Sequence, residues 1–336
     1  MPRPVKGRDT IGLDVGSHSI KTVVVDTSKT KPVLSAYNVK LVPSGKKKIP
    51  IDQLIKELFD EINIKPSEIN LSISGGDVIV RFITLPRMDK ASLEESMVFE
   101  ADRYIPFNVN EVIMDFAILD DAGEGKMNVL LAAAKSDFVE GQLELFRKIG
   151  IRVNLMDINA FSVFNAFSMS NDIDPVQGTG FFDLGHSQTT VMIATGKMPR
   201  FMRVIQTGGK DITKAISEDM GVTQEEAENI KYDQPKGMED KVARATSVVI
   251  DELVKEMQLS FSYFENKYGK GIDHIYCSGG MVYQKGVQNI IGEKLGLKVN
   301  GWDVLGGLSM ADSLSREALS GVSSQLAAAI GLGLRG

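Results

Sequence analysis

"IGLDVGSHSIKTVVVD" (residues 11–26) and "GFFDLGHSQTTVMIAT" (residues 180–195) share one pattern: an apolar strand, Asp-x-Gly, a short turn rich in Ser and His, and a β-branched strand. Each stretch predicts two strands joined by a tight turn. Asp183 follows Asp14 by 169 residues in a chain of 336 residues. This spacing of half a chain favours an internal duplication, in which two related α/β halves each carry one hairpin.

The bulk composition is that of a globular protein with more than one domain. A chain of 336 residues is too long for one ordinary core, and its 43% hydrophobic and 24% charged residues are near the globular average. The net charge of -6 argues against a general nucleic-acid binder, which needs a basic surplus to neutralise phosphates. The basic run "GKKK" at 45–48 is short and predicts a solvated loop. We therefore expect no nucleic-acid partner.

Cysteine usage and hydropathy bear on the compartment. Cys277 is the only cysteine of the sequence, so no intrachain disulfide can form and a reducing environment fits best. The N-terminal "MPRPVKGRDT" has no apolar core of signal-peptide length, and no stretch approaches the roughly 18 apolar residues of a membrane span. We expect a cytoplasmic protein without direct membrane insertion, which reaches a membrane through a partner.

The first hairpin has the residue types that hold a phosphate. Gly16 lets the main chain approach a ligand, and Ser17 and Ser19 add hydroxyl donors. Lys21 can neutralise phosphate oxygens as a point charge. Asp14 would be repelled by phosphate, so we expect it to hold the water shell of a Mg²⁺ ion. This hairpin predicts one half of a triphosphate site.

The second hairpin supplies the matching half. Asp183, Gly185 and Ser187 repeat the pattern, and Asp183 is a second candidate for Mg²⁺ through water. Two Gly-Gly turns precede helical patterns, at Gly208–Gly209 and Gly279–Gly280, and the second of these suits the nucleoside side of a nucleotide. Two opposed hairpins therefore predict a clamp around a triphosphate and its metal.

The histidines of the chain are interpreted without a catalytic or metal function. His18 and His186 lie in the two predicted turns, and His274 lies in a predicted strand. No Ser-His-Asp ordering accompanies them. Only His274 has a cysteine nearby at the spacing of a zinc site, and this cysteine, Cys277, lies in the same predicted strand. We interpret His18 and His186 as turn residues and expect no metal-ligand cluster.

The motifs, in their order, resemble the actin-like ATPase superfamily, which includes FtsA and the heat-shock chaperones. "IGLDVGSHSIK" and "FFDLGHSQTT" look like the two phosphate motifs, "MDINAFSVFNAF" and "QLAAAIGLGL" like the two connecting helices, and "IYCSGGMVYQKGVQNI" like the adenosine motif. The strings "LEESMVFEADRYIPF" and "GGKDITKAI" look like the PilM family of type IV pilus assembly proteins. The resemblance implies an α/β fold of two lobes with a small α+β subdomain inserted in the first lobe, as in FtsA.

With this fold the sequence predicts seven segments. They are residues 1–85 for the first-lobe core, 86–155 for the inserted subdomain, 156–177 for the first connecting helix, 178–215 and 270–322 for the second-lobe core, 216–269 for a helical subdomain, and 323–336 for a closing helix back to the first lobe.

The resemblance also implies ligands and partners. ATP and Mg²⁺ would bind between the lobes through the residues named above, and Glu228 and Lys231 would contact adenine and ribose. The N-terminal tail of the inner-membrane protein PilN would lie in a groove between the first lobe and the inserted subdomain, with residues 78–115 forming one wall. Through PilN the chain would reach the inner-membrane platform and motor of the pilus. The resemblance leaves self-association open.

One position departs from many relatives. Their first connecting helix begins with Glu or Gln followed by Pro, whose side chain orients the attacking water, and this chain has Asn159 and Ala160. Asn159 and Asp183 are the candidate catalytic residues. Because the shorter amide of Asn159 accepts no proton, hydrolysis should be slow or absent. The alternatives are a small-metabolite kinase of the same superfamily and a filament-forming or FtsA-like cell-division protein.

Overall fold

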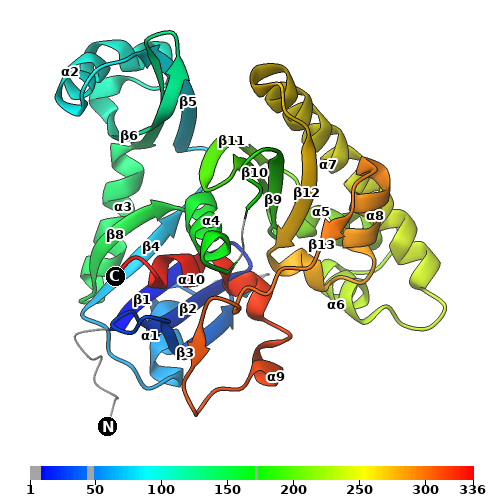
Figure 1. Cartoon of the computed structure of the whole chain (residues 1–336). Coiled ribbons are helices and arrows are strands. Elements are labelled where there is room, and N and C mark those ends of the chain that lie inside the picture. Colours follow the sequence, from blue (N-terminus) through cyan, green and yellow to red (C-terminus); the bar gives the residue numbers. More distant parts are fainter. Residues whose placement is uncertain (1–8, 44–48, 171–172) are drawn as a thin grey trace. The chain divides into compact units, whose positions relative to one another are not determined.

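The computed structural model describes residues 9–43, 49–170 and 173–336, so the basic run at 45–48 lies outside the described residues. The chain divides into two compact units (Figure 1). The larger unit consists of Met1–Ser72 and Asn154–Gly336, and the smaller one of Ile73–Val153.

The larger unit is built on two sheets. The first has the strand order β14-β3-β2-β1-β4-β8. Its strands and accompanying helices are β1 (Asp9–Val15), β2 (Ser19–Asp26), β3 (Val33–Leu41), α1 (Ile51–Glu61), β4 (Glu68–Ile73), β8 (Arg152–Ile158), α4 (Asn159–Ser170), β14 (Ser309–Met310), α9 (Arg316–Leu319) and α10 (Ala327–Gly333).

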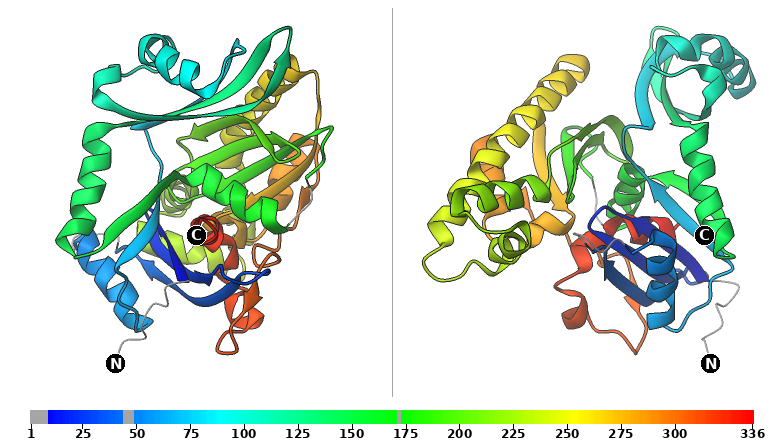
Figure 2. Two further views of the ribbon diagram at one scale, coloured as in Figure 1. Left: turned by 60° about the vertical axis from the view of Figure 1, so that its left-hand side comes forward. Right: turned by 180° about the vertical axis from the view of Figure 1, so that it is seen from behind.

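Helices cover both faces of the first sheet because both faces of its strands are apolar. Val23 and Val25 of β2 belong to one buried cluster with Ala329 and Ile330 of α10. Val24 lies between them in the strand and is also buried, so it points to the opposite face. Helix α1 packs against β2 and β3 on that face, and α10 and α1 are seen on opposite sides of the sheet (Figure 2).

The second sheet has the strand order β11-β10-β9-β12-β13. Its elements are β9 (Gly178–Leu184), β10 (Thr189–Thr195), β11 (Met198–Ile205), α5 (Gly209–Met220), α6 (Gln224–Asp233), α7 (Glu239–Tyr268), β12 (Ile272–Ser278), α8 (Val287–Leu295) and β13 (Val299–Asn300). Consecutive residues of β9 again point to opposite faces of the sheet. Phe181 packs edge-on against Phe167 of α4, and Phe182 stacks on Phe261 of α7.

Both sheets repeat one topology. β1, β2 and β3 are antiparallel neighbours, and β4 lies parallel to β1. β9, β10 and β11 are likewise antiparallel, and β12 lies parallel to β9. The predicted hairpins are therefore β1–β2 and β9–β10, and the structure agrees with the duplication that the sequence indicates.

One predicted boundary falls in the wrong half. The sequence places residues 270–322 in the second-lobe core, but β14 pairs in parallel with β3 of the first sheet. Val304, Leu308 and Leu319 are buried in the same cluster as Val23 and Val25. The chain thus returns to the first sheet before the closing helix. The predicted boundary at 215 also lies inside α5, which runs to Met220.

The smaller unit is a three-stranded antiparallel sheet with two helices. Its elements are β5 (Val78–Pro86), α2 (Lys90–Glu100), β6 (Val112–Gly123), β7 (Lys126–Lys135) and α3 (Ser136–Lys148), with the strand order β5-β7-β6. Leu93 and Met97 of α2 pack on Leu85 and Leu131 of the sheet. The sequence assigns β5 to the first lobe, but β5 pairs with β7 along its whole length, so this unit begins at Ile73 and not at 86.

No helix in the described part of the chain combines the length and the hydropathy that crossing a membrane requires.

Candidate functional site

The first hairpin places a carboxylate and an amine side by side. Asp14 and Lys21 are directly opposite each other in β1 and β2, and Lys21 Nζ donates to Asp14 Oδ2 at 2.9 Å. The Gly16 N–H donates to the Ser19 carbonyl at 3.1 Å and closes the turn. A Cβ at Gly16 would lie 2.9 Å from the backbone carbonyl oxygen of Ser19, so the closed turn requires glycine here.

Each hairpin aspartate has a serine partner on the neighbouring parallel strand. Ser72 of β4 is in register with Asp14, and its hydroxyl donates to Asp14 Oδ1 at 2.9 Å. Ser278 of β12 is in register with Asp183, and its hydroxyl donates to Asp183 Oδ1, also at 2.9 Å. Neither serine is predicted from the sequence, because a local pattern contains no information on the register between distant strands. The duplicated structure therefore extends to the groups that hold the two carboxylates.

The charge of Asp14 affects the protonation of Asp183. Burial raises the pKa of Asp183, and the nearby Asp14 carboxylate raises it further. A divalent cation would relieve this repulsion, since Mg²⁺ prefers oxygen ligands and keeps much of its water shell. The donor set of Asp14 and Asp183 thus fits the predicted Mg²⁺ site.

Asn159 reaches the first of these carboxylates. It is the first residue of α4, which directly follows β8, and its Nδ2 donates to Asp14 Oδ1 at 3.3 Å. The position that departs from many relatives therefore lies in the same hydrogen-bonded group as Asp14, Lys21 and Ser72.

The start of α5 packs on the second hairpin. The Gly209 N–H donates to the Gly185 carbonyl at 3.0 Å, and a Cβ at Gly208 would lie 2.6 Å from the His186 carbonyl oxygen. Glycine is thus required at position 208 because the backbone at the start of α5 lies in contact with the backbone of the β9–β10 turn. The sequence predicts a helix-entry turn here with a role on the nucleotide side, and this close approach explains why the turn contains glycine.

The tips of the two hairpins meet. Ser17 Oγ and Ser187 Oγ are 3.0 Å apart. The imidazoles of His18 and His186 stack with their centroids 4.5 Å apart and their planes at 28°. Burial lowers the pKa of His18, and burial together with His18 lowers the pKa of His186 to about 4.

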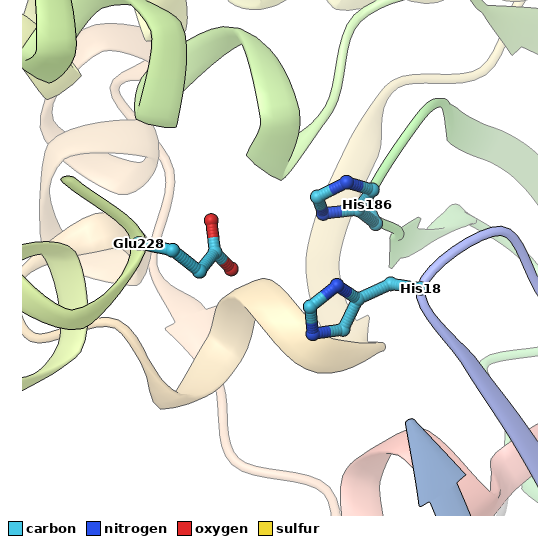
Figure 3. Close-up of side chains that lie close together, drawn as sticks. All are labelled: His18, His186 and Glu228. Carbon is cyan, nitrogen blue, oxygen red and sulfur yellow. The ribbon is translucent and has the colours of Figure 1, made fainter. Parts of the chain in front are cut away.

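A carboxylate from α6 faces this pair of rings (Figure 3). One nitrogen of each imidazole and one Glu228 oxygen lie within 4.8 Å of one another. His18 and His186 lie in the turns, as the sequence predicts, but the expectation of no metal-ligand cluster is wrong, because the two imidazoles and Glu228 form a group with the spacing of metal ligands. The signal was present in the sequence, since each histidine occupies a turn of the duplicated hairpin, but only the fold brings the two turns together.

Lys231 holds Glu228 in place. Lys231 is fully buried on α6, and its Nζ donates to both Glu228 oxygens at 2.8 Å and to the Thr213 hydroxyl at 2.9 Å. It also donates to the Gly209 carbonyl at 3.2 Å. Thr213 is itself hydrogen-bonded to Glu228 and is not predicted from the sequence. Lys231 thus acts on Glu228 and on the backbone at the start of α5.

The last glycine pair follows β12. Gly279 has a φ of 91°, which favours glycine, and a Cβ there would lie 2.9 Å from Asp183 Oδ1. Its N–H donates to the Ser324 carbonyl at 3.1 Å. Gly280 begins the short 3-10 helix η3 (Gly280–Tyr283), and a Cβ at Gly280 would have no neighbour within 4 Å.

Most of the predicted residues thus gather at the two hairpins. Two of them differ from the expectation in what they contribute. Ser19 is buried and closes the turn through its carbonyl rather than presenting a hydroxyl. Gly280 lies beside open space and makes no close approach.

The chain is similar to a family of known proteins and to several solved structures. Residues 12–336 match the family model described as type IV pilus assembly protein PilM. A solved structure described as the PilM-PilN type IV pilus biogenesis complex is 27% identical, covers 97% of this chain and 98% of that chain, and has a TM-score of 0.85. The ethanolamine utilization protein EutJ from Carboxydothermus hydrogenoformans is 15% identical, with 100% of this chain and 93% of that chain covered and a TM-score of 0.57. The fold is the expected actin-like ATPase fold, and the chain belongs to the PilM family of type IV pilus assembly proteins.

Proposed function

We propose that the chain is an ATP-binding scaffold of type IV pilus assembly that binds the N-terminal tail of PilN. The proposal of nucleotide binding rests on the pair of duplicated hairpins. They bring Asp14, Lys21 and Asp183 close together, beside the contact between Ser17 and Ser187. The partner follows from the family and from the similar solved complex, which contains PilN.

The residues of the site would divide the work as follows. The Lys21 ammonium would donate to a phosphate oxygen in place of Asp14. Asp14 and Asp183 would hold water ligands of Mg²⁺. Bound Mg²⁺ would supply positive charge to the triphosphate. Glu228, oriented by Lys231, would accept hydrogen bonds from ribose hydroxyls.

Turnover should be slow because of the group beside Asp14. The Asn159 amide donates to Asp14 and cannot take a proton from water. Binding without rapid hydrolysis suits a scaffold, whose bound nucleotide keeps the two hairpins together.

Nucleotide binding is tested by Lys21→Met. Losing a charged donor to phosphate should weaken Mg²⁺·ATP binding by about tenfold or more, because such a hydrogen bond contributes roughly 1.5–3 kcal/mol. Calorimetry on desalted protein measures the affinity, and phosphate release in the same samples measures turnover. Lys197→Met, an exposed lysine at the β10–β11 turn, is the matched control and should bind like the wild type. Equal affinity in Lys21→Met, or no nucleotide binding by the wild type, would refute the site.

Binding of PilN is tested on the smaller unit. Phe99 of α2 is 83% exposed and Ile113 of β6 is 54% exposed, and both lie within the predicted wall at 78–115. Patches of exposed apolar side chains mark interaction sites, and these two residues are the ones through which we test whether the wall forms such a patch. Phe99→Ser and Ile113→Ser should each weaken binding of a labelled N-terminal PilN peptide by about tenfold, the effect of a residue that contributes more than about 1 kcal/mol.

The control for this experiment is Leu259→Ser, which removes a similarly exposed apolar side chain from α7 of the larger unit. Fluorescence anisotropy measures the affinity, with a scrambled peptide for comparison. If Leu259→Ser weakens binding as much as the two variants of the smaller unit, the effect is general and the peptide site is not at this wall.

A further inference from the structure

Three potential metal ligands converge where the two hairpins meet α6. His18 comes from the turn of β1–β2, His186 from the turn of β9–β10, and Glu228 from α6. The close-up shows both rings and the carboxylate turned toward a common space (Figure 3). In residues 9–43, 49–170 and 173–336 this is the only group of three or more such ligands that lies within ligating reach.

The three groups are in the form that binds a metal. Both imidazoles are neutral at pH 7 because burial lowers the pKa of each, so each offers a nitrogen lone pair. The charged groups that face them are Glu228, which favours a cation, and Lys21, Lys210 and Lys231, which oppose one. The positive charges of these three lysines therefore limit the affinity for a cation but leave the two imidazole nitrogens available.

Glu228 is held as metal-binding carboxylates usually are. Lys231 Nζ lies 2.8 Å from each of its oxygens, and the Thr213 hydroxyl is bonded to it as well. Outer hydrogen bonds of this kind fix the orientation of a ligand. Glu228 Oε2 accepts from both Lys231 and Thr213, whereas Oε1 accepts from Lys231 and keeps a second lone pair for a metal ion.

We propose that His18, His186 and Glu228 form a binding site for a borderline divalent transition-metal ion, with Zn²⁺ as the best match. Two imidazoles and one carboxylate are a ligand set of zinc sites that keep a fourth position open. Imidazole nitrogen suits Zn²⁺, whereas Mg²⁺ prefers oxygen, so this site is chemically distinct from the one at Asp14 and Asp183. The bound ion links the β1–β2 turn to the β9–β10 turn and to α6.

The test is a Zn²⁺ titration of the untagged full chain, freed of nucleotide and metal, by calorimetry. Binding of Co²⁺, followed by its visible absorption, reports the geometry. His18→Gln and His186→Gln should each weaken Zn²⁺ binding by at least about tenfold and abolish the tetrahedral Co²⁺ bands. Because no nucleotide is present, the result does not depend on whether the chain binds ATP.

His274→Gln is the matched control, since the third histidine of the chain is exposed on β12 and outside the group. It should bind Zn²⁺ like the wild type. Thermal melting verifies that the histidine variants are folded, and Glu228→Gln is avoided because it would leave Lys231 buried without its counter-charge. Unchanged Zn²⁺ affinity in His18→Gln and His186→Gln, or no Zn²⁺ binding by the wild type, would overturn the proposal.

Discussion

Lys231→Met is expected to lower the free energy of unfolding by about 3 kcal/mol at neutral pH, because it leaves a largely buried carboxylate without its cation. Lys231 has no exposed side-chain surface, and Glu228 is 21% exposed. The methionine fills the space of the alkyl chain but offers no donor to Glu228, Thr213 or the Gly209 carbonyl. Urea unfolding followed by circular dichroism measures the change.

The pH dependence identifies the cause of this loss. Burial is the largest single influence on the pKa of Glu228 and raises it, but Lys231, Thr213 and His18 together lower it more, so the pKa lies below its ordinary value of 4.5. A carboxylate with a lowered pKa stabilises the fold above its ordinary pKa and loses that contribution as the pH falls through its folded pKa. In Lys231→Met the effect of burial is opposed only by the smaller effects of Thr213 and His18, so the carboxylate binds a proton more readily. The difference in stability between wild type and variant should therefore shrink near pH 4.

Two further variants separate the ion pair from simple loss of packing. Lys231→Met combined with Glu228→Gln removes both charges and should lose less stability than Lys231→Met alone. Lys236→Met, at an exposed lysine just after α6, should be neutral. A double variant as unstable as the single one would mean that packing, and not the unpaired carboxylate, accounts for the loss.

The sequence predicts the parts of this molecule that depend on local pattern. The strand-turn-strand stretches around Asp14 and Asp183 form hairpins at the expected residues, because β-branched runs and Gly turns act over a few positions. The pairing of Lys21 with Asp14 is not predicted, although the turn length of the hairpin sets the register that puts the two residues opposite each other.

Features that depend on contacts between distant segments are the ones that the sequence does not predict. The serines at 72 and 278 become partners of the aspartates only through the parallel register of β4 and β12. β14 is only two residues long and has no strand pattern of its own, so the local sequence does not predict that the chain returns to the first sheet there. Burial of Lys231 and the meeting of His18 with His186 likewise require the folded arrangement of α6 and the two turns.

Gly331→Ala is expected to lower the free energy of unfolding by about 3 kcal/mol, at the upper end of the usual effect of an added methyl group in a packed core. Gly331 lies in α10 where that helix crosses α4, and a Cβ there would overlap the carbonyl oxygen of Ser162. The neighbour is backbone inside a helix, so it cannot move aside as a side-chain end would. The same helix meets β1 at Gly12, where a Cβ would overlap the Ala329 carbonyl, so α10 is held closely on both sides.

The sign of the effect distinguishes packing from helix propensity. Alanine favours a helix over glycine by about 1 kcal/mol, so without the close approach Gly331→Ala would stabilise α10. Gly321→Ala is the matched control: its Cβ would meet no atom within 4 Å and its φ is not in the left-handed region, so stability should stay within about 0.5 kcal/mol of wild type. Urea midpoints of the two variants and wild type give the comparison. A Gly331→Ala protein as stable as the control would mean that α4 and α10 can separate without loss, and the duplicated sheets would then not depend on this helix pair.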